Sequence, residues 1–357
     1  MNIEFKLANK IIGVKRPVYF IADIAANHDG KLDQAYDLIS AAKDAGADAA
    51  KFQHFNAKTI VSDYGFKDLG LKFSHQKNWK KSVFDTYKEA SINLSWTEKL
   101  KNKCDKIGIE FCSTPYSKEL TDHIHDYVNF YKIGSGDITW IEIIEHIASK
   151  GKPVILSTGA SNFIEVEKAL KAIKKHTKNI VIMQCNTNYT ANDDNNLNFI
   201  NLNVLKTYGK KFPGVILGLS DHTTGDETVL GSVVLGARVI EKHFTLNNDL
   251  DGPDHKFSMN PKSWELMVKK TRSLEKSMGD GEKKIEKNEI ETSILQRRSI
   301  RSKSTIKKGS VLKKESFEFL RPCPKEGIRP YDSHKIIGKK TKNQILQGDI
   351  IKWEDLE

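Results

Sequence analysis

The sequence predicts a (β/α)8 barrel that is followed by a small β-rich domain. Eight apolar segments, rich in Val, Ile and Phe, recur along the first 280 residues. They are apolar on both faces, as parallel strands are when both sides of the sheet are covered. Helix-like segments separate them, and eight alternating strands and helices are typical of a barrel. The expected strands are residues 17–25, 48–55, 109–115, 130–137, 153–159, 180–186, 215–221 and 238–245.

The segments between these strands carry helical patterns. Residues 32–47 place apolar side chains three to four positions apart, and they end near Gly46, which suits a C-terminal cap. Similar patterns occupy residues 164–176, 228–237 and 261–279. The last of these is expected to be the eighth helix of the barrel.

One crossover, residues 56–108, is longer than a barrel needs. It is expected to carry an inserted helix over the barrel mouth at 82–92, before the regular helix at 97–108. A doubly wound open sheet is the alternative architecture. It ranks lower because no GxGxxG motif follows the first strand.

The barrel pattern stops at residue 280, so residues 1–280 are expected to form one domain. Residues 281–298 are polar, lack core periodicity and are predicted to be a linker. Residues 299–357 contain two similar turn-rich phrases, IKKGSVL and ILQGDIIKW. They are predicted to form a β-rich domain of their own.

Composition narrows the function classes. No apolar run approaches the roughly 18 residues of a membrane span, and the first residues lack the order of a signal peptide. The four cysteines show no CxxC spacing, so we expect reduced thiols and a cytoplasmic protein. Of the net charge of +11, residues 281–357 hold 19 Lys+Arg and 12 Asp+Glu, or +7. These charges alternate in sign and aromatic residues are sparse there, so neither a nucleic-acid nor a membrane partner is expected.

Polar side chains stand at the carboxyl ends of the expected strands, where barrel enzymes build their active sites. Lys51 and Lys132 end two otherwise apolar strands, and a lysine there is costly unless an anion meets it. With nearby hydroxyls they suit a phosphate and a carboxylate. Pairing with a core carboxylate and a Schiff-base lysine are the alternatives. The strand-end residues include Asp23, Lys51, Gln53, Thr114, Lys132, Ser135, Asp137, Thr187, Tyr189, Ser220, His222, Glu241 and His243.

His222 and His243 end two successive strands, and an acidic loop with Asp254 follows the second. Two histidines with carboxylates nearby are the mixed nitrogen and oxygen ligands of an open divalent metal site. The alternatives are two hydrogen-bonded barrel histidines or a two-histidine, one-carboxylate iron oxygenase. The lysines that suit phosphate do not fit the latter.

Eight phrases in order make the chain similar to a known family. They are IADIAANHDG, AGADAAKFQ, FCSTPYS, YKIGSGD, ILSTG, GLSDHT, LGARVIEKHFT and DGPDHKFSM. Together they resemble the sialic acid synthase family. The C-terminal phrases STIKKGSVLKKESFEFLRP, IIGKK and ILQGDII resemble the antifreeze-like (SAF) domain of that family.

The resemblance implies an activity. Phosphoenolpyruvate would condense with the open-chain aldehyde of an N-acylated mannosamine to give a nonulosonic (sialic) acid and phosphate. It implies a divalent metal, Mn²⁺ with Mg²⁺ or Co²⁺ as alternatives, held by His222 and His243. It also implies a domain-swapped homodimer, in which Arg321 reaches the partner's site and holds the N-acyl group of the sugar.

The same resemblance assigns roles to the strand-end residues. The catalytic set would be Asp23, Lys51, Lys132, Asp137, His222 and His243. The substrate-binding set would be Gln53, Thr114, Ser135, Thr187, Tyr189, Ser220, Asp254 and Arg321. Within these sets Lys51, Thr114, Lys132, Ser135 and Ser220 would surround phosphoenolpyruvate, while Gln53, Tyr189 and Asp254 would face the sugar and Glu241 would support the metal.

The chain departs from the family at three positions. Asp23 and Asp137 stand where the family usually has Glu, and Thr187 stands where some members have Asn. These changes leave the sugar open between N-acetylmannosamine and 2,4-diacetamido-2,4,6-trideoxymannose. The GPDHK phrase resembles the sialic and legionaminic groups more than the pseudaminic group. The alternatives are a pseudaminic acid synthase with an altrose-type sugar and a non-catalytic, glycan-binding relic.

Overall fold

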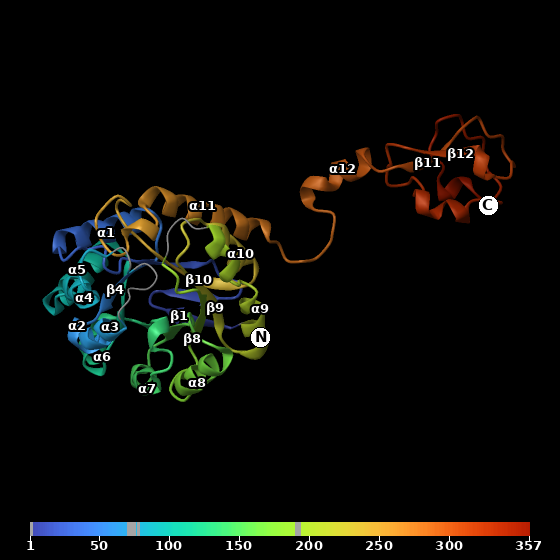
Figure 1. The fold of residues 1–357 in the computed structure, drawn as a ribbon. Coiled ribbons are helices and arrows are strands. Elements are labelled where there is room, and N and C mark those ends of the chain that lie inside the picture. Colours follow the sequence, from blue (N-terminus) through green and yellow to red (C-terminus); the bar gives the residue numbers. More distant parts are fainter. Residues whose placement is uncertain (1–2, 70–75, 77–78, 190–193) are drawn as a thin grey trace. The chain divides into compact units, whose positions relative to one another are not determined.

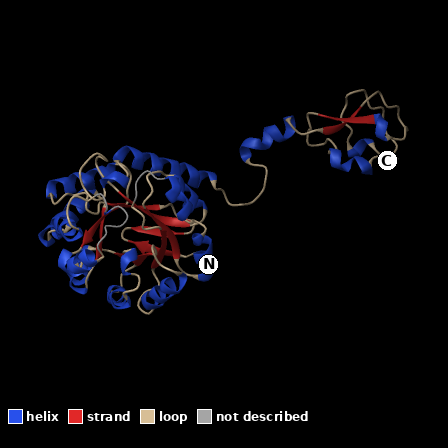
Figure 2. Cartoon of the chain, in the orientation of Figure 1, coloured by secondary structure: helices blue, strands red, loops and turns tan. Residues whose placement is uncertain are grey.

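The computed structural model describes residues 3–69, 76, 79–189 and 194–357. The chain divides into two compact units, Met1–Gly279 and Asp280–Glu357. The first unit holds an eight-stranded parallel sheet with helices around it (Figures 1 and 2). No described helix is long and apolar enough to cross a membrane.

The eight predicted barrel strands are confirmed. Their hydrogen-bonded order is β5-β4-β3-β10-β9-β8-β7-β6, and the two end strands, β5 and β6, contact each other to close the ring. The strands are β3 (Tyr19–Asp23), β4 (Ala49–His54), β5 (Glu110–Pro115), β6 (Tyr131–Ile133), β7 (Val154–Ser157), β8 (Ile180–Cys185), β9 (Ile216–Asp221) and β10 (Ala237–His243). Because all eight run parallel, their carboxyl ends meet at one mouth.

Helices cover the outside of the barrel, and a large apolar cluster fills the layer between them and the strands. The sequence sets their ends: Gly46 follows α1 at φ +93° and Gly108 follows α5 at φ +72°, a backbone region that favours glycine. Asn162 caps α8 with a reciprocal capping box. The outer helices are α1 (Leu32–Asp44), α5 (Thr97–Ile107), α6 (Lys118–Ile124), α7 (Ile141–Ser149), α8 (Phe163–Lys174), α9 (Val204–Lys211), α10 (Glu227–Val234) and α11 (Pro261–Ser277).

A short antiparallel hairpin precedes the barrel, and we did not predict it. It consists of β1 (Glu4–Leu7) and β2 (Lys10–Gly13). Its side chains Phe5, Leu7 and Ile12 join the cluster that fills the inside of the barrel. The cluster contains residues near the strand starts, such as Tyr19, so the hairpin covers the end of the barrel opposite the mouth.

The long crossover holds the predicted inserted helix and two further short helices. These are α2 (Ala57–Ile60), α3 (Asp63–Asp68) and α4 (Val83–Ala90), each with a side-chain N-cap from Asn56, Ser62 or Ser82. A short 3-10 turn, Leu94–Trp96, leads into α5. Residues of α2 and α4 line the pocket at the barrel mouth, where the inserted helix was expected.

The second unit is small and rich in short β pairings. It contains η7 (Lys287–Glu289), α12 (Ile290–Leu295), β11 (Ser299–Ser302), β12 (Phe317–Leu320) and three 3-10 turns, Lys314–Ser316, Pro330–Lys335 and Trp353–Asp355. The two similar phrases pair with each other through reciprocal backbone hydrogen bonds between Ile306 and Ile345. An apolar cluster around Ile300 and Ile336 forms its core. The segment predicted to be a linker, 281–298, includes one α-helix, α12, which directly follows the 3-10 helix η7.

Candidate active site

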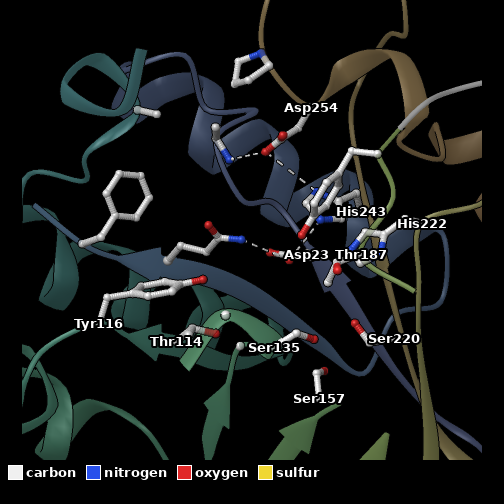
Figure 3. A pocket seen from close by; sticks show the side chains of 18 of the residues that line it. Asp23, Thr114, Tyr116, Ser135, Ser157, Thr187, Ser220, His222, His243 and Asp254 are labelled. Carbon is white, nitrogen blue, oxygen red and sulfur yellow. Dashed lines mark hydrogen bonds and ion pairs between the residues drawn. The ribbon is translucent and has the colours of Figure 1, made fainter. Parts of the chain in front are cut away.

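A cavity of about 410 Å³ opens at the carboxyl ends of the barrel strands, and Figure 3 shows part of its lining. This volume lies within the range of small-molecule sites, about 300–1,000 Å³. The cavity brings together every site residue predicted from the first unit: Asp23, Lys51, Gln53, Thr114, Lys132, Ser135, Asp137, Thr187, Tyr189, Ser220, His222, His243 and Asp254. Arg321 is exposed and belongs to the second unit.

Two buried lysines form the charged floor of this cavity. Lys51 Nζ lies 2.7 Å from Asp23 Oδ2 and 3.8 Å from Glu241 Oε1, and Lys132 Nζ lies 3.2 Å from the same Glu241 oxygen. Burial alone would lower the pKa of Lys51, but the charges of Asp23 and Glu241 outweigh it and raise that pKa. Lys51 therefore stays cationic. Both lysines meet protein carboxylates, so the alternative of pairing with core acids applies to each of them.

Three buried polar atoms in the cavity have no hydrogen-bond partner among the described residues. They are Thr114 Oγ1, Glu241 Oε2 and His243 Nδ1. The other oxygen of Glu241 accepts a hydrogen bond from Ser220 Oγ at 3.0 Å. A buried polar atom without a partner costs about 1–3 kcal/mol, so three of them in one cavity indicate a place for a polar ligand.

The absence of a side chain at Gly159 lets Thr187 and Ser135 lie close to its backbone beside the floor. A Cβ at Gly159 would lie 2.6 Å from Thr187 Cγ2 and 2.9 Å from Ser135 Oγ. The backbone N–H of Gly159 instead donates to Ser135 Oγ at 2.9 Å. This bond fixes the position of the Ser135 oxygen at the cavity.

His222 and His243 lie side by side, with ring centroids 5.3 Å apart (Figure 3). The Nδ1 of His222 is 2.8 Å from the carbonyl oxygen of Asn186, so this nitrogen donates and the Nε2 has a free lone pair when the ring is neutral. Burial opposes the charged ring, but the neighbouring Cys185 thiol outweighs burial and raises the pKa of His222. Tyr189 packs edge-on against both rings, at 4.4 Å and 6.1 Å between centroids. Burial is the largest cause of a pKa for His243 well below its ordinary value, so this ring is neutral.

These donors fit a weakly held cation in an open site. Neutral imidazoles bind divalent transition metals, and His243 Nδ1 is one of the unpartnered atoms. Two carboxylates lie near the nitrogens of His243. Asp23 Oδ2 is 3.6 Å from His243 Nε2, and Asp254 Oδ2 is 3.9 Å from His243 Nδ1. Among the described residues, no three His, Cys, Asp or Glu side chains gather as a closed ligand set. A cation here would complete its coordination with substrate and water.

Two further carboxyls titrate near neutrality. Burial raises the pKa of Asp137 to about 6, and burial also raises the pKa of Asp254 to about 6. Asp254 accepts a hydrogen bond from the backbone N–H of Ala26 at 3.3 Å. Each can hold or release a proton near neutral pH.

The raised pKa of Asp137 predicts a pH-dependent cost in stability. Between its ordinary pKa of 3.8 and about 6, the folded protein keeps a proton that the unfolded chain has lost. The contribution of this proton to the free energy of unfolding is therefore complete below pH 3.8, and it disappears as the pH rises through about 6. Relative to Asp137→Asn, the free energy of unfolding should fall by about 2 kcal/mol between about pH 4 and about pH 7.5. Urea unfolding at these two pH values measures the change in the free energy of unfolding. The exposed Asp126→Asn is the control. Parallel curves for wild type and Asp137→Asn would contradict the assignment.

Apolar and aromatic side chains form a further part of the lining, here called the apolar wall. Its members are Phe55, Ile60, Trp79, Tyr87 and Ala90. The Phe55 and Tyr87 rings pack at 5.4 Å between centroids. Apart from Phe55, which follows β4, these residues come from the insertion.

Reading strand ends did not identify this wall, nor Tyr116 and Cys185, which also line the cavity. Tyr116 directly follows a strand end, so the same rule could have included it. Phe55 ends the expected strand 48–55, so the rule could have included it as well. The other four wall residues could not be found in that way because the rule covers strands, whereas an insertion reaches the site through its own packing.

The chain is similar to known proteins along nearly its whole length. Residues 38–283 match the NeuB family, and residues 297–357 match the SAF domain. The N,N'-diacetyllegionaminic acid synthase of Legionella pneumophila is 34% identical, with 98% of each chain covered. The pseudaminic acid synthase of Campylobacter jejuni is 31% identical, with 96% of this chain and 97% of the relative covered. The crystal structure of N-acetylneuraminic acid (sialic acid) synthetase from Leptospira borgpetersenii superimposes with a TM-score of 0.72 at 31% identity, covering 82% of this chain and 95% of that one.

Proposed function

Because the chain belongs to the NeuB family and ends in a SAF domain, we propose that it condenses phosphoenolpyruvate with an N-acylated mannosamine. The products are a nonulosonic acid and phosphate. The observation that carries the proposal is one cavity that joins two neighbouring histidines to a floor with two buried lysines and unpartnered polar atoms. The cytoplasm, where phosphoenolpyruvate is made, is the proposed location, and the four cysteines are free thiols.

The floor is where phosphoenolpyruvate fits. Lys51 and Lys132 supply positive charge, and Thr114, Ser135 and Ser220 supply hydroxyls for the phosphate and carboxylate oxygens. The lysines are shared with Asp23 and Glu241, so the floor is close to neutral before the substrate arrives. An anionic substrate then depends on fixed donors aimed at its oxygens, because the floor offers little excess positive charge.

His222 and His243 are the residues that would hold a divalent cation, Mn²⁺ with Mg²⁺ or Co²⁺ as alternatives. Such an ion, when bound, supplies Lewis-acid polarisation of the aldehyde carbonyl of the sugar. The charges of the site favour it. Two lysines give +2 and four carboxylates, Asp23, Asp137, Glu241 and Asp254, give −4 when ionised, so the net is −2.

The chain's own residues position the reactants and move protons. The third carbon of phosphoenolpyruvate forms a bond to the aldehyde carbon, water adds to the second carbon, and the C–O bond to phosphate breaks. As the second carbon becomes a carbonyl, the second proton of the water passes to the departing phosphate. In the other two transfers, the aldehyde oxygen gains a proton and the water loses its first one as it adds. Asp137 and Asp254, each with a pKa of about 6, are suited to these two transfers. Tyr189 packs against both imidazoles and limits the room for bulk water beside them.

The apolar wall favours a 6-deoxy sugar. Phe55, Ile60 and Ala90 line the same cavity as the histidines and the floor. With the aldehyde at the histidines and phosphoenolpyruvate on the floor, we place the far carbons of the sugar against these apolar side chains. A methyl group buries well there, whereas a hydroxymethyl group loses water without finding an equivalent partner. Such a wall discriminates by about 10–100-fold in kcat/KM. We therefore propose 2,4-diacetamido-2,4,6-trideoxymannose in preference to N-acetylmannosamine.

The test is phosphate release from phosphoenolpyruvate and Mn²⁺ with these two sugars, with the altrose-type epimer and with no sugar. Fastest release with the trideoxymannose supports the proposal. Fastest release with the altrose-type sugar would make the protein a pseudaminic acid synthase. No release with any of them would contradict an enzymatic role and favour the glycan-binding relic.

We also propose a homodimer in which the second unit serves the partner's site. Apolar side chains that are exposed within this unit would suit a surface that a second copy of the chain covers. Ile290 and Leu295 on α12 are 54% and 60% exposed, and Leu320 beside Arg321 is 42% exposed. A second copy is the partner that would bring Arg321 to the sugar.

Replacing Arg321 by alanine should weaken sugar binding. We expect KM for the sugar to rise by about 10–100-fold with KM for phosphoenolpyruvate unchanged, because one charged hydrogen bond to the N-acyl oxygen is worth about 1.5–3 kcal/mol. The exposed Lys308→Ala, which removes the same charge from the same unit, is the control. Light scattering should show dimers for all variants. An unchanged sugar KM for Arg321→Ala would remove this residue from the site.

A further inference from the structure

A buried ion pair stands directly behind the two histidines. Asp221 precedes His222 at the end of β9, and Lys242 precedes His243 at the end of β10. The two residues are register partners in the parallel ladder. Successive side chains of a strand point to opposite faces, so this pair faces away from the cavity that the histidines line. Ile240, two positions before Lys242, accordingly lies in the cluster between strands and helices.

Lys242 is 1% exposed and its ammonium group is fully engaged. It contacts Asp221 Oδ2 and the carbonyl oxygens of Thr223 and Gly225, at 2.6 Å and 3.0 Å for the two carbonyls. These contacts hold the short loop that follows His222 and leads into α10.

Asp221 completes the arrangement. Its Oδ2 accepts from Thr223 Oγ1 at 2.8 Å and from Thr228 Oγ1 at 2.7 Å, and its Oδ1 accepts from the Thr223 N–H at 3.2 Å. The backbone on each side of His222 is thus tied to the residue that precedes His243.

We propose that the Asp221–Lys242 pair is a positioning device that sets the spacing of the two imidazoles and so the affinity of the site for a divalent cation. The inference rests on the proposed function, in which His222 and His243 hold that cation. Loss of groups that orient metal ligands typically lowers metal affinity about 10–100-fold. Packing alone does not require a charged pair here, since apolar side chains of similar volume fill buried sites at least as stably.

The experiment is Mn²⁺ titration of metal-free protein, with free Mn²⁺ followed by electron paramagnetic resonance. Its variants are Asp221→Asn with Lys242→Met, which removes both charges and leaves none buried alone, and Thr228→Val, which removes one hydrogen bond to Asp221. We expect affinity to fall about 10–100-fold in the double variant. The Thr228→Val variant should show a smaller loss, about two- to fivefold. Circular dichroism identifies the variants that fold.

The matched control is Lys270→Met. Lys270 also pairs with an acid near this loop, Asp226 at 2.9 Å, but its side chain is 46% exposed and it touches neither histidine strand. The Lys270→Met variant should bind Mn²⁺ with the affinity of the parent protein. Parental affinity in a folded double variant would overturn the inference, and if that variant does not fold, parental affinity in Thr228→Val would do so. Absence of Mn²⁺ binding by the parent would instead overturn the proposed function.

Discussion

Replacing His222 by alanine is expected to remove divalent-cation binding and to lower kcat/KM for phosphate release at least about 1,000-fold. The physical reason is that only one of the two imidazoles would remain, and the nearest carboxylates do not form a closed ligand set with it among the described residues. Polarisation of a carbonyl by a bound cation is worth several kcal/mol, and each 1.36 kcal/mol is about tenfold in rate. Phosphate release and Mn²⁺ titration measure the two losses on the same preparation.

The control for this variant is the exposed His176→Ala, which should match the parent in both measurements. In His222→Ala, the loss of Mn²⁺ binding and the loss of phosphate release must occur together. Full turnover by His222→Ala, or full turnover by the parent in metal-free buffer, would show that the reaction does not need a cation at the histidines.

Replacing Lys132 by methionine is expected to lower kcat/KM for phosphoenolpyruvate by about 100–1,000-fold. Truncating one partner of a buried charged pair costs about 2–5 kcal/mol, and here the loss falls on the floor that receives the anionic substrate. Glu241 keeps Lys51 at 3.8 Å and Ser220 at 3.0 Å, so the variant should still fold. Steady-state kinetics with phosphoenolpyruvate varied, together with a thermal melt, measures both effects.

Lys118→Met serves as the control because Lys118 pairs with Glu142 at the surface, where its side chain is 44% exposed. Surface pairs contribute about 0–1 kcal/mol, so its kinetics should equal those of the parent. If Lys132→Met were well folded and kept the parental KM and kcat, phosphoenolpyruvate would have to bind elsewhere.

The barrel could be predicted because its signals are local. Each strand is a short apolar run, and glycines such as Gly46 and Gly108 mark where helices stop. The amino-terminal hairpin was missed because its apolar residues, including Leu7 and Ile12, are few and interrupted by charges. Their burial comes from packing inside the barrel, which a local pattern does not express.

The site residues could be gathered from the sequence because a parallel barrel brings all its strand ends to one mouth. The ion pairs that the two lysines form with Asp23 and Glu241 could not be predicted from the sequence in the same way. Lys51 meets Asp23 because β3 and β4 are in register at these two residues, and Lys132 meets Glu241 from a strand that is not its neighbour. Such contacts depend on register and on the shear of the barrel, which no single segment encodes.

The measurement that tests the central claim most directly uses phosphoenolpyruvate with oxygen-18 in the bridge between carbon and phosphorus. The enzyme, Mn²⁺ and 2,4-diacetamido-2,4,6-trideoxymannose are added, and the products are analysed by mass spectrometry. A condensation in which water adds to the second carbon predicts a nonulosonic acid without the label and an equal amount of phosphate that carries it. Unlabelled phosphate, or phosphate without a new nine-carbon acid, would contradict the account.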